Sequence, residues 1–171
     1  MSRFLWLVIV ASLCWTPAFA AKKMAPTGTK VVASYDAAKK AYLSGNFDLA
    51  MRHFRVLADH GDNRAIFFIG FMYETGRGVT QSYELAHEHY LQAAAGREIR
   101  AMNSMGYFYE KGIVVDPDIV TAHMWYNLAA SQGHGDAMRA RNVLNEQLSS
   151  VQMTKAQKMA KDWNRAHPMA Q

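Results

Sequence analysis

The stretch that decides the fold is Ala65–Ala94, AIFFIGFMYETGRGVTQSYELAHEHYLQAA, because its pattern recurs 36 residues later. The second copy is Ala101–Ala130, AMNSMGYFYEKGIVVDPDIVTAHMWYNLAA. Small and aromatic residues coincide in the two copies, at Ala65/Ala101, Gly70/Gly106, Tyr73/Tyr109, Gly76/Gly112, Ala86/Ala122, Tyr90/Tyr126, Ala93/Ala129 and Ala94/Ala130. A period of about 20–50 residues is typical of stacked-repeat proteins, whose single units cannot bury their apolar faces alone. The repeat therefore favours a binding surface over a catalytic pocket.

The pattern continues in weaker form on both sides of these copies. From about Val31 onward, helical stretches alternate with short polar breaks, and no stretch shows the alternation of a strand. The breaks lie at Gly45-Asn46, Gly61-Asp62-Asn63, Gly76-Arg77-Gly78, Gly96-Arg97, Gly112, Asp116-Pro117 and Gly133-His134-Gly135. Ser149 and Gln152 fit a capping box, after which an amphipathic helix closes the array. We predict an all-α protein, an αα-hairpin superhelix with eight helices in four hairpins.

Both copies resemble the Sel1-like repeat, a subfamily of tetratricopeptide-like helical hairpins. The first copy carries A-x3-I-G-x-M-Y-x2-G-x-G-V-x6-A-x3-Y-x2-A-A, and the second carries A-x3-M-G-x2-Y-x2-G-x-V-V-x2-D-x3-A-x2-W-Y-x2-A-A. Residues 35–63 are similar to a plain tetratricopeptide hairpin, and Leu148–Trp163 is similar to the closing helix of Sel1-like arrays. The resemblance implies a repeat domain over 31–166, with a tetratricopeptide-like hairpin at 31–63, Sel1-like repeats at 64–99 and 100–135, a closing hairpin at 136–166 and a tail at 167–171.

Three positions depart from the family pattern. His89 stands where a Trp is usual, Ser82 replaces the usual Asp, and Val114 replaces the second loop glycine. Because Val resists the positive φ that Gly adopts freely, Val114 puts the family's backbone path in doubt for the loop 112–116.

The first twenty residues have the composition of a secretory signal peptide. Arg3 precedes the apolar run 4–13, and Pro17 precedes the small-x-small ending Ala18-Phe19-Ala20. The run is shorter than the roughly 20 residues of a membrane span, so an uncleaved anchor is the minor alternative. We expect cleavage before Ala21, a flexible lead-in over 21–30, export to the periplasm or beyond, and no stable membrane insertion afterwards.

The predicted mature chain has about 151 residues, a typical size for one domain. It has no cysteine, because Cys14 leaves with the signal peptide. Its net charge is about +4 once Arg3 is removed, and no basic block gathers on one segment. A nucleic-acid-binding face would need clustered Lys and Arg, so we expect no nucleic-acid partner.

The polar residues do not converge on a catalytic, cofactor or metal site. His87 and His89 are two residues apart and point to different sides of a helix. Glu74 and Glu110 are repeat equivalents, which indicates repeat surface rather than an acid–base pair. Tyr73, Tyr90, Tyr109, Trp125 and Tyr126 are expected to fill the repeat core. We therefore expect neither an enzyme nor a cofactor.

In tetratricopeptide-like stacks the first helix of each hairpin lines a concave groove. Carried over to this chain, the resemblance implies a partner-binding groove formed by Tyr35, Arg64, Phe67, Phe71, Arg100, Asn103, Tyr107 and Arg139, with Lys39, Tyr42, Phe68, Glu74 and Lys111 nearby. Aromatic residues flanked by Arg suit an extended peptide or a partner helix. The alternative is that Phe67, Phe68 and Phe71 pack against the lead-in or neighbouring helices.

These observations leave three functions open. The leading hypothesis is an exported adaptor that binds a protein or peptide partner in the cell envelope through this groove. The second is an accessory protein of the cell wall or of an exopolysaccharide, which exposed Tyr and Trp could serve. A hydrolase is the third.

Overall fold

The computed structural model describes residues 33–168, which form eight α-helices and no strand. The helices are α1 (Tyr35–Leu43), α2 (Phe47–Asp59), α3 (Asn63–Thr75), α4 (Tyr83–Ala95), α5 (Ile99–Lys111), α6 (Ile119–Ala130), α7 (Gly135–Asn145) and α8 (Ser150–Ala166). The all-α prediction and the number of helices are confirmed. The predicted signal peptide, the lead-in and the last three residues of the tail lie outside the described residues.

Each helix begins where the sequence supplies an N-cap. The cap side chain accepts a hydrogen bond from a backbone N–H of the first turn, at Ser34, Asn46, Asp62, Ser82, Glu98, Asp118, His134 and Ser149. Such bonds satisfy N–H groups that have no partner within the helix. At α8 the Gln152 side chain also bonds back to the Ser149 backbone, so the predicted capping box is present.

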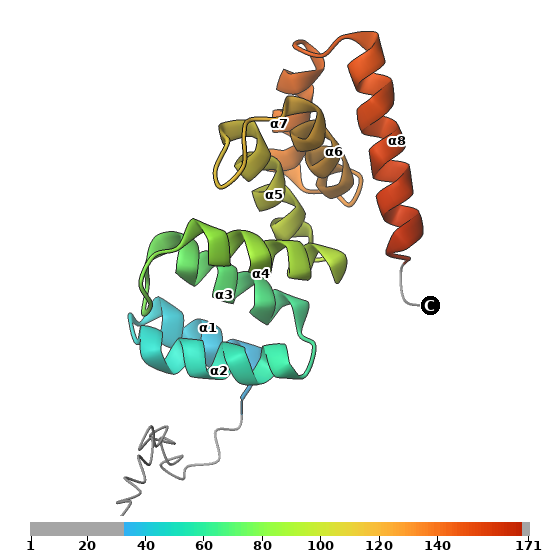
Figure 1. Ribbon diagram of the computed structural model, residues 1–171. Coiled ribbons are helices and arrows are strands. Elements are labelled where there is room, and N and C mark those ends of the chain that lie inside the picture. Colours follow the sequence, from blue (N-terminus) through green and yellow to red (C-terminus); the bar gives the residue numbers. More distant parts are fainter. Residues whose placement is uncertain (1–32, 169–171) are drawn as a thin grey trace, which may run out of the picture. The chain divides into compact units, whose positions relative to one another are not determined.

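The first six helices form three hairpins, as Figure 1 shows. The pairs are α1 with α2, α3 with α4 and α5 with α6, and the α2–α3 and α4–α5 contacts join one hairpin to the next. This succession of contacts is that of a helical-hairpin solenoid.

The last pair of helices packs differently. Both α7 and α8 make their main contacts with α6, rather than with each other as in the three hairpins before them. The end of α8 is held by Arg97 from the turn between α4 and α5, which donates to Asn164 Oδ1 at 3.1 Å and to the His167 carbonyl at 2.9 Å. The long closing helix therefore lies across the preceding elements.

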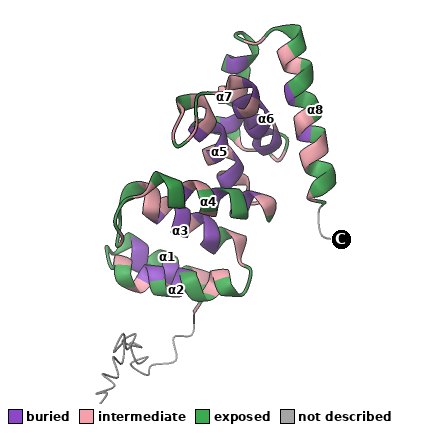
Figure 2. Cartoon of the chain, in the orientation of Figure 1, coloured by how far each residue is buried: buried purple, intermediate pink, exposed green. Residues whose placement is uncertain are grey.

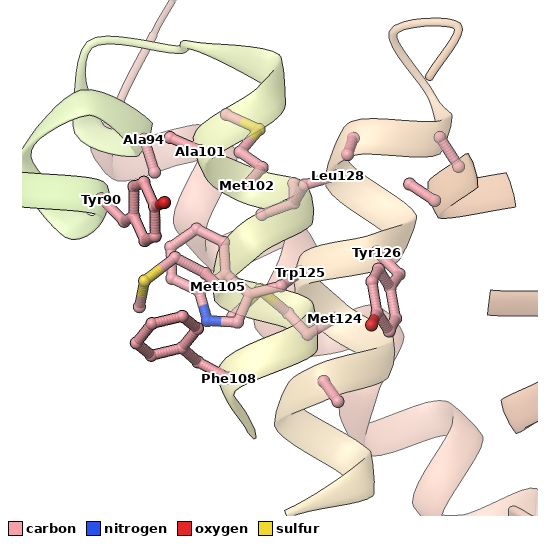
Figure 3. Packing of buried hydrophobic residues seen from close by; sticks show 14 of the residues in the cluster. Tyr90, Ala94, Ala101, Met102, Met105, Phe108, Met124, Trp125, Tyr126 and Leu128 are labelled. Atoms are coloured by element: carbon pink, nitrogen blue, oxygen red, sulfur yellow. The ribbon is translucent and has the colours of Figure 1, made fainter. Parts of the chain in front are cut away.

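The buried residues form two adjoining clusters, shown in purple along the helices in Figure 2. The first is built from α1, α2 and α3 around Phe54 and Met72. The second extends from α3 to α8, and Figure 3 shows its centre, where Tyr90, Met105 and Phe108 lie with Trp125 between α4, α5 and α6. Tyr90, Trp125 and Tyr126 are buried, as predicted for the repeat core, and Tyr73 and Tyr109 pack partly buried against it.

A glycine, a tyrosine and a glutamate close each central hairpin in the same way. The Tyr126 ring of α6 lies so close to Gly106 of α5 that a Cβ there would be 2.5 Å from Tyr126 Cδ1. The Tyr126 hydroxyl then donates to Glu110 Oε2 at 2.8 Å. Gly106 and Glu110 are four residues apart and therefore share one side of α5.

The preceding hairpin repeats the arrangement with Gly70, Tyr90 and Glu74. A Cβ on Gly70 would be 2.9 Å from Tyr90 Cδ1, and the Tyr90 hydroxyl donates to Glu74 Oε2. Burial raises the pKa of Tyr90, and the negative charge of Glu74 raises it further. Both tyrosines therefore stay protonated and act as donors. The two glutamates, expected to be plain repeat surface, instead accept hydrogen bonds from the core, which corrects that expectation.

The loop between α5 and α6 keeps the path of the loop between α3 and α4, which removes the doubt that Val114 raised. Val114 has a φ of +74°, and Gly78 at the equivalent position has +73°. A residue with a Cβ pays about 1–2 kcal/mol for this left-handed conformation. The packing of α5 against α6 is thus strong enough to impose the repeat's backbone path on a β-branched residue.

Three histidines are packed between helices. His123 of α6 is buried, and its Nε2 lies 2.8 Å from Asn145 Oδ1. His89 of α4 is stacked on Tyr73 with ring centroids 5.6 Å apart, so an imidazole fills the place where the family usually has a Trp. Burial lowers the pKa of His87, His89 and His123 below the ordinary value of 6.5.

Replacing Gly106 by Ala is expected to lower the free energy of unfolding. The added methyl group would overlap the Tyr126 ring, which is fixed by burial and by Glu110, and overpacking of this kind costs about 1–3 kcal/mol. In Gly135→Ala a Cβ would meet only Arg139 Nη1 at 3.7 Å, so this control should be neutral or slightly stabilising. Urea unfolding of both variants measures the difference. A Gly106→Ala protein as stable as the control would contradict the close approach of α5 and α6.

Acidification from pH 7 to pH 5 is expected to destabilise the fold. The folded state holds His87, His89 and His123 at a lowered pKa, so the unfolded chain, with an ordinary value of 6.5, binds more protons in this range. The stability that these residues contribute is complete above that value and is lost as the pH falls below it. Urea midpoints at pH 7, 6 and 5 measure the slope, which His87→Gln with His89→Gln should flatten. A slope of zero or of opposite sign would exclude this account.

Candidate functional site

The first helices of the hairpins bring five of the predicted groove residues together. Arg100 of α5 lies over the Phe67 ring of α3, with its guanidinium carbon 4.6 Å from the ring centroid, and its Nη1 is 3.4 Å from the Tyr35 hydroxyl of α1. Arg64 of α3 lies over the ring of the same Tyr35, with its guanidinium carbon 4.3 Å from the ring centroid. We call this surface the aromatic–arginine face and define it by Tyr35, Arg64, Phe67, Phe68, Phe71 and Arg100.

Phe68 lies at the centre of this cluster. Its ring stacks on Phe54 with centroids 4.9 Å apart and meets Tyr35 edge-on at 5.9 Å. Phe67 packs against Tyr90 and is buried, so at this residue the alternative of packing against neighbouring helices holds. Phe71 is half-buried and contributes an edge to the surface. The phenylalanines therefore form the apolar floor of the face, and the arginines and Tyr35 form its outer layer.

Each arginine of the face is held by the acid that caps its own helix. Arg64 bonds to Asp62 at 2.7 Å, and Arg100 bonds to Glu98 at 2.7 Å, which repeats the same pair 36 residues later. The Arg64 guanidinium lowers the pKa of Asp62, and backbone N–H donors at the helix start add to this effect against the cost of burial. The guanidinium groups are thus fixed in orientation over the rings but remain partly exposed, with 56% and 37% of their side-chain surfaces accessible.

The other three predicted groove residues do not take part in these ring contacts. Asn103 is half-buried on α5, and Tyr107 on the same helix is 43% exposed. Arg139 on α7 is exposed and paired with Asp136 of its own helix. The structure therefore concentrates the predicted site in α1, α3 and the first turn of α5.

The structure also contains a second polar region, which the sequence did not predict. A cavity of about 410 Å³ lies between α6, α7 and α8, and its walls are formed by His123, Asn127, Arg141, Asn145, Met153 and Gln157. Each helix contributes two residues that are four positions apart and so share one side of that helix. This spacing was the available signal, but no repeat equivalents single these residues out.

Among residues 33–168 there is no group of three or more His, Asp, Glu or Cys side chains that could hold a metal ion. None of the described helices combines the length and apolar character that a membrane crossing requires.

Comparison with known proteins identifies the repeats. The family model of the Sel1 repeat matches residues 63–96 and 99–134. No curated protein matches the chain as a sequence.

Two solved structures are similar over most of the chain. A Sel1 repeat protein from Oxalobacter formigenes has 26% sequence identity and a TM-score of 0.64, and the match covers 78% of this chain and 58% of that one. A protective antigen of uropathogenic Escherichia coli that displays an SLR fold has 21% identity and a TM-score of 0.71, covering 77% of this chain and 29% of that one. The match thus spans less than two thirds of the length of either protein.

The matched segments coincide with α3–α4 and α5–α6, the two hairpins closed by the glycine–tyrosine–glutamate arrangement. The chain therefore contains two successive Sel1 repeats, over residues 63–96 and 99–134.

Proposed function

We propose that this chain is an exported, non-enzymatic adaptor that binds a protein or peptide partner through the aromatic–arginine face. Sel1 repeat proteins generally mediate protein–protein interactions, and their fold is typically a non-enzymatic scaffold.

The observation that carries the proposal is the position of Arg100. It spans three helices, because it lies over Phe67 and Phe68 of α3 and reaches the Tyr35 hydroxyl of α1. A partly exposed guanidinium above aromatic rings is a frequent centre of protein interfaces, where Arg and aromatic residues contribute most of the binding energy.

The face suits a partner segment that carries carboxylates beside apolar side chains. Arg64 and Arg100 present positive charge at two points separated by one repeat, and the edges of Tyr35 and Phe71 lie beside them. Both arginines already bond to their cap acids, so a partner carboxylate would share a guanidinium whose orientation is fixed before binding. Fixing a side chain in advance reduces the entropy lost on association.

Export is proposed from the N-terminal sequence. Arg3, the apolar run 4–13 and the Ala18-Phe19-Ala20 ending form a secretory pattern, and a mature chain without cysteine folds in an oxidising compartment without rearranging disulfides. We place the adaptor in the periplasm or outside the cell.

Charge reversal on the face is expected to weaken partner binding. Arg64→Glu with Arg100→Glu should reduce the capture of the partner that co-purifies with the wild-type protein from the native envelope fraction by about tenfold or more, because both anchoring charges are inverted. Quantitative mass spectrometry of affinity-purified complexes measures capture, and the mass of the bait reports whether it begins at Ala21.

Two controls match these variants. Arg165→Glu inverts an exposed arginine of α8, far along the chain from the face. Tyr83→Ala on α4 can be compared with Tyr107→Ala on α5, since the two tyrosines are 42% and 43% exposed. Loss of binding in Tyr107→Ala but not in Tyr83→Ala extends the interface along α5. If the wild type and the Arg64/Arg100 double variant capture the partner equally, the aromatic–arginine face is not part of the interface.

A further inference from the structure

The cavity between α6, α7 and α8 shares no residue with the aromatic–arginine face, so a ligand bound there would be independent of a partner bound at that face. The cavity exists because α7 and α8 pack on α6 and not closely on each other. Its volume of about 410 Å³ falls within the range of small-ligand sites, about 300–1,000 Å³. It is lined by three pairs of residues at helical spacing, one pair from each helix.

The cavity has a positive charge, and no acidic side chain among the described residues pairs with it. Arg141 contributes the formal charge, and no Asp or Glu lines the walls. The guanidinium donates to two neutral amide oxygens, Asn127 Oδ1 at 3.3 Å and Asn142 Oδ1 at 3.2 Å, while its Nε is buried without a partner among residues 33–168. Buried donors in native proteins are nearly always bonded, so an unpaired guanidinium N–H is exceptional.

His123 supplies a second unsatisfied group beside Arg141. This residue is 2% exposed, and its Nε2 lies 2.8 Å from Asn145 Oδ1, an acceptor, which places the proton on Nε2. The Nδ1 atom is then an acceptor, and it is buried with no hydrogen-bond partner in the described part of the chain. Burial, and the nearby charge of Arg141, lower the pKa of His123, so the imidazole is neutral at pH 7.

The hydrogen-bonding groups of the cavity indicate which class of ligand it would bind. A planar guanidinium with free N–H donors matches a carboxylate, which accepts two parallel hydrogen bonds. Its present bonds from the two Nη atoms to amide oxygens are long and go to neutral acceptors, which a carboxylate would replace with a stronger acceptor.

We propose that the cavity between α6, α7 and α8 is a carboxylate-binding site in which Arg141 is the anchoring residue. Asn127, Asn145 and Gln157 supply neutral hydrogen-bonding groups around it, and Met153 supplies an apolar wall. The carboxylate comes either from a small free acid or from the C-terminus of a peptide.

Titration with paired probes tests the site. Succinate and its diamide represent the free acid, and N-acetyl-Ala-Ala and its C-terminal amide represent the peptide end. Binding is followed by calorimetry and by the NMR signals of the Asn127 and Asn145 side-chain amides. We expect saturable binding of at least one acid, with the matching amide about tenfold weaker or more. Tighter binding of succinate identifies a free acid as the ligand, and tighter binding of the peptide identifies a peptide end.

Three variants test whether the acid binds in this cavity. Arg141→Gln should weaken the acid about tenfold or more, whereas Arg165→Gln, which removes an exposed guanidinium of α8, should leave the affinity unchanged. Gln157→Glu changes an exposed wall residue, so the fold tolerates it, and its carboxylate should compete with the ligand and weaken binding similarly. The proposal is overturned if neither acid saturates, if acid and amide bind equally, or if Gln157→Glu binds as wild type does.

Discussion

The other features depend on one constraint, the close approach of a tyrosine ring to a glycine. The hydroxyl of that tyrosine also donates a hydrogen bond to a glutamate one turn beyond the glycine. This arrangement occurs between α3 and α4 and again between α5 and α6. Because both hairpins close in the same way, Arg64 and Arg100 arise at equivalent places of successive first helices. Their caps, Asp62 and Glu98, repeat as well, and so each arginine is oriented by its own helix. The loop that joins the two helices of each hairpin also repeats, since Val114 has a φ of +74° where Gly78 has +73°.

Much of the fold can be predicted from the sequence, because the same pattern of residues occurs in two successive copies. The glycine, alanine and aromatic positions predict which helices pair, and the caps that begin α2 to α7 lie within the polar breaks or a few residues after them. The sequence does not predict the packing of the last two helices, since after Ala137 no earlier copy shows which side of α8 meets which neighbour. The role of Glu74 and Glu110 was hidden for a related reason. A glutamate at a helix end has the same appearance in a sequence whether it faces water or a buried hydroxyl.

The candidate sites differ in how far the sequence could reveal them. The aromatic–arginine face lies on repeat equivalents, so its arginines and Phe71 could be named in advance, but the depth of each ring depended on packing with α1 and α4. Phe67 is buried by Tyr90, and Phe68 is the centre of the cluster although it was expected only nearby. The α6–α8 cavity lies outside the repeat pattern. Its residues become neighbours only because α7 and α8 both rest on α6.

A double-mutant cycle on Tyr126 and Glu110 tests the central constraint most directly. Tyr126→Phe removes the hydroxyl donor, Glu110→Met removes the carboxylate acceptor, and urea unfolding of both single variants and the double variant gives the coupling free energy. The hydrogen bond to a half-buried carboxylate predicts a coupling of about 1 kcal/mol or more. Losses that add to within about 0.3 kcal/mol would show that the two groups do not act together, and the hairpins would then be held by ring packing alone.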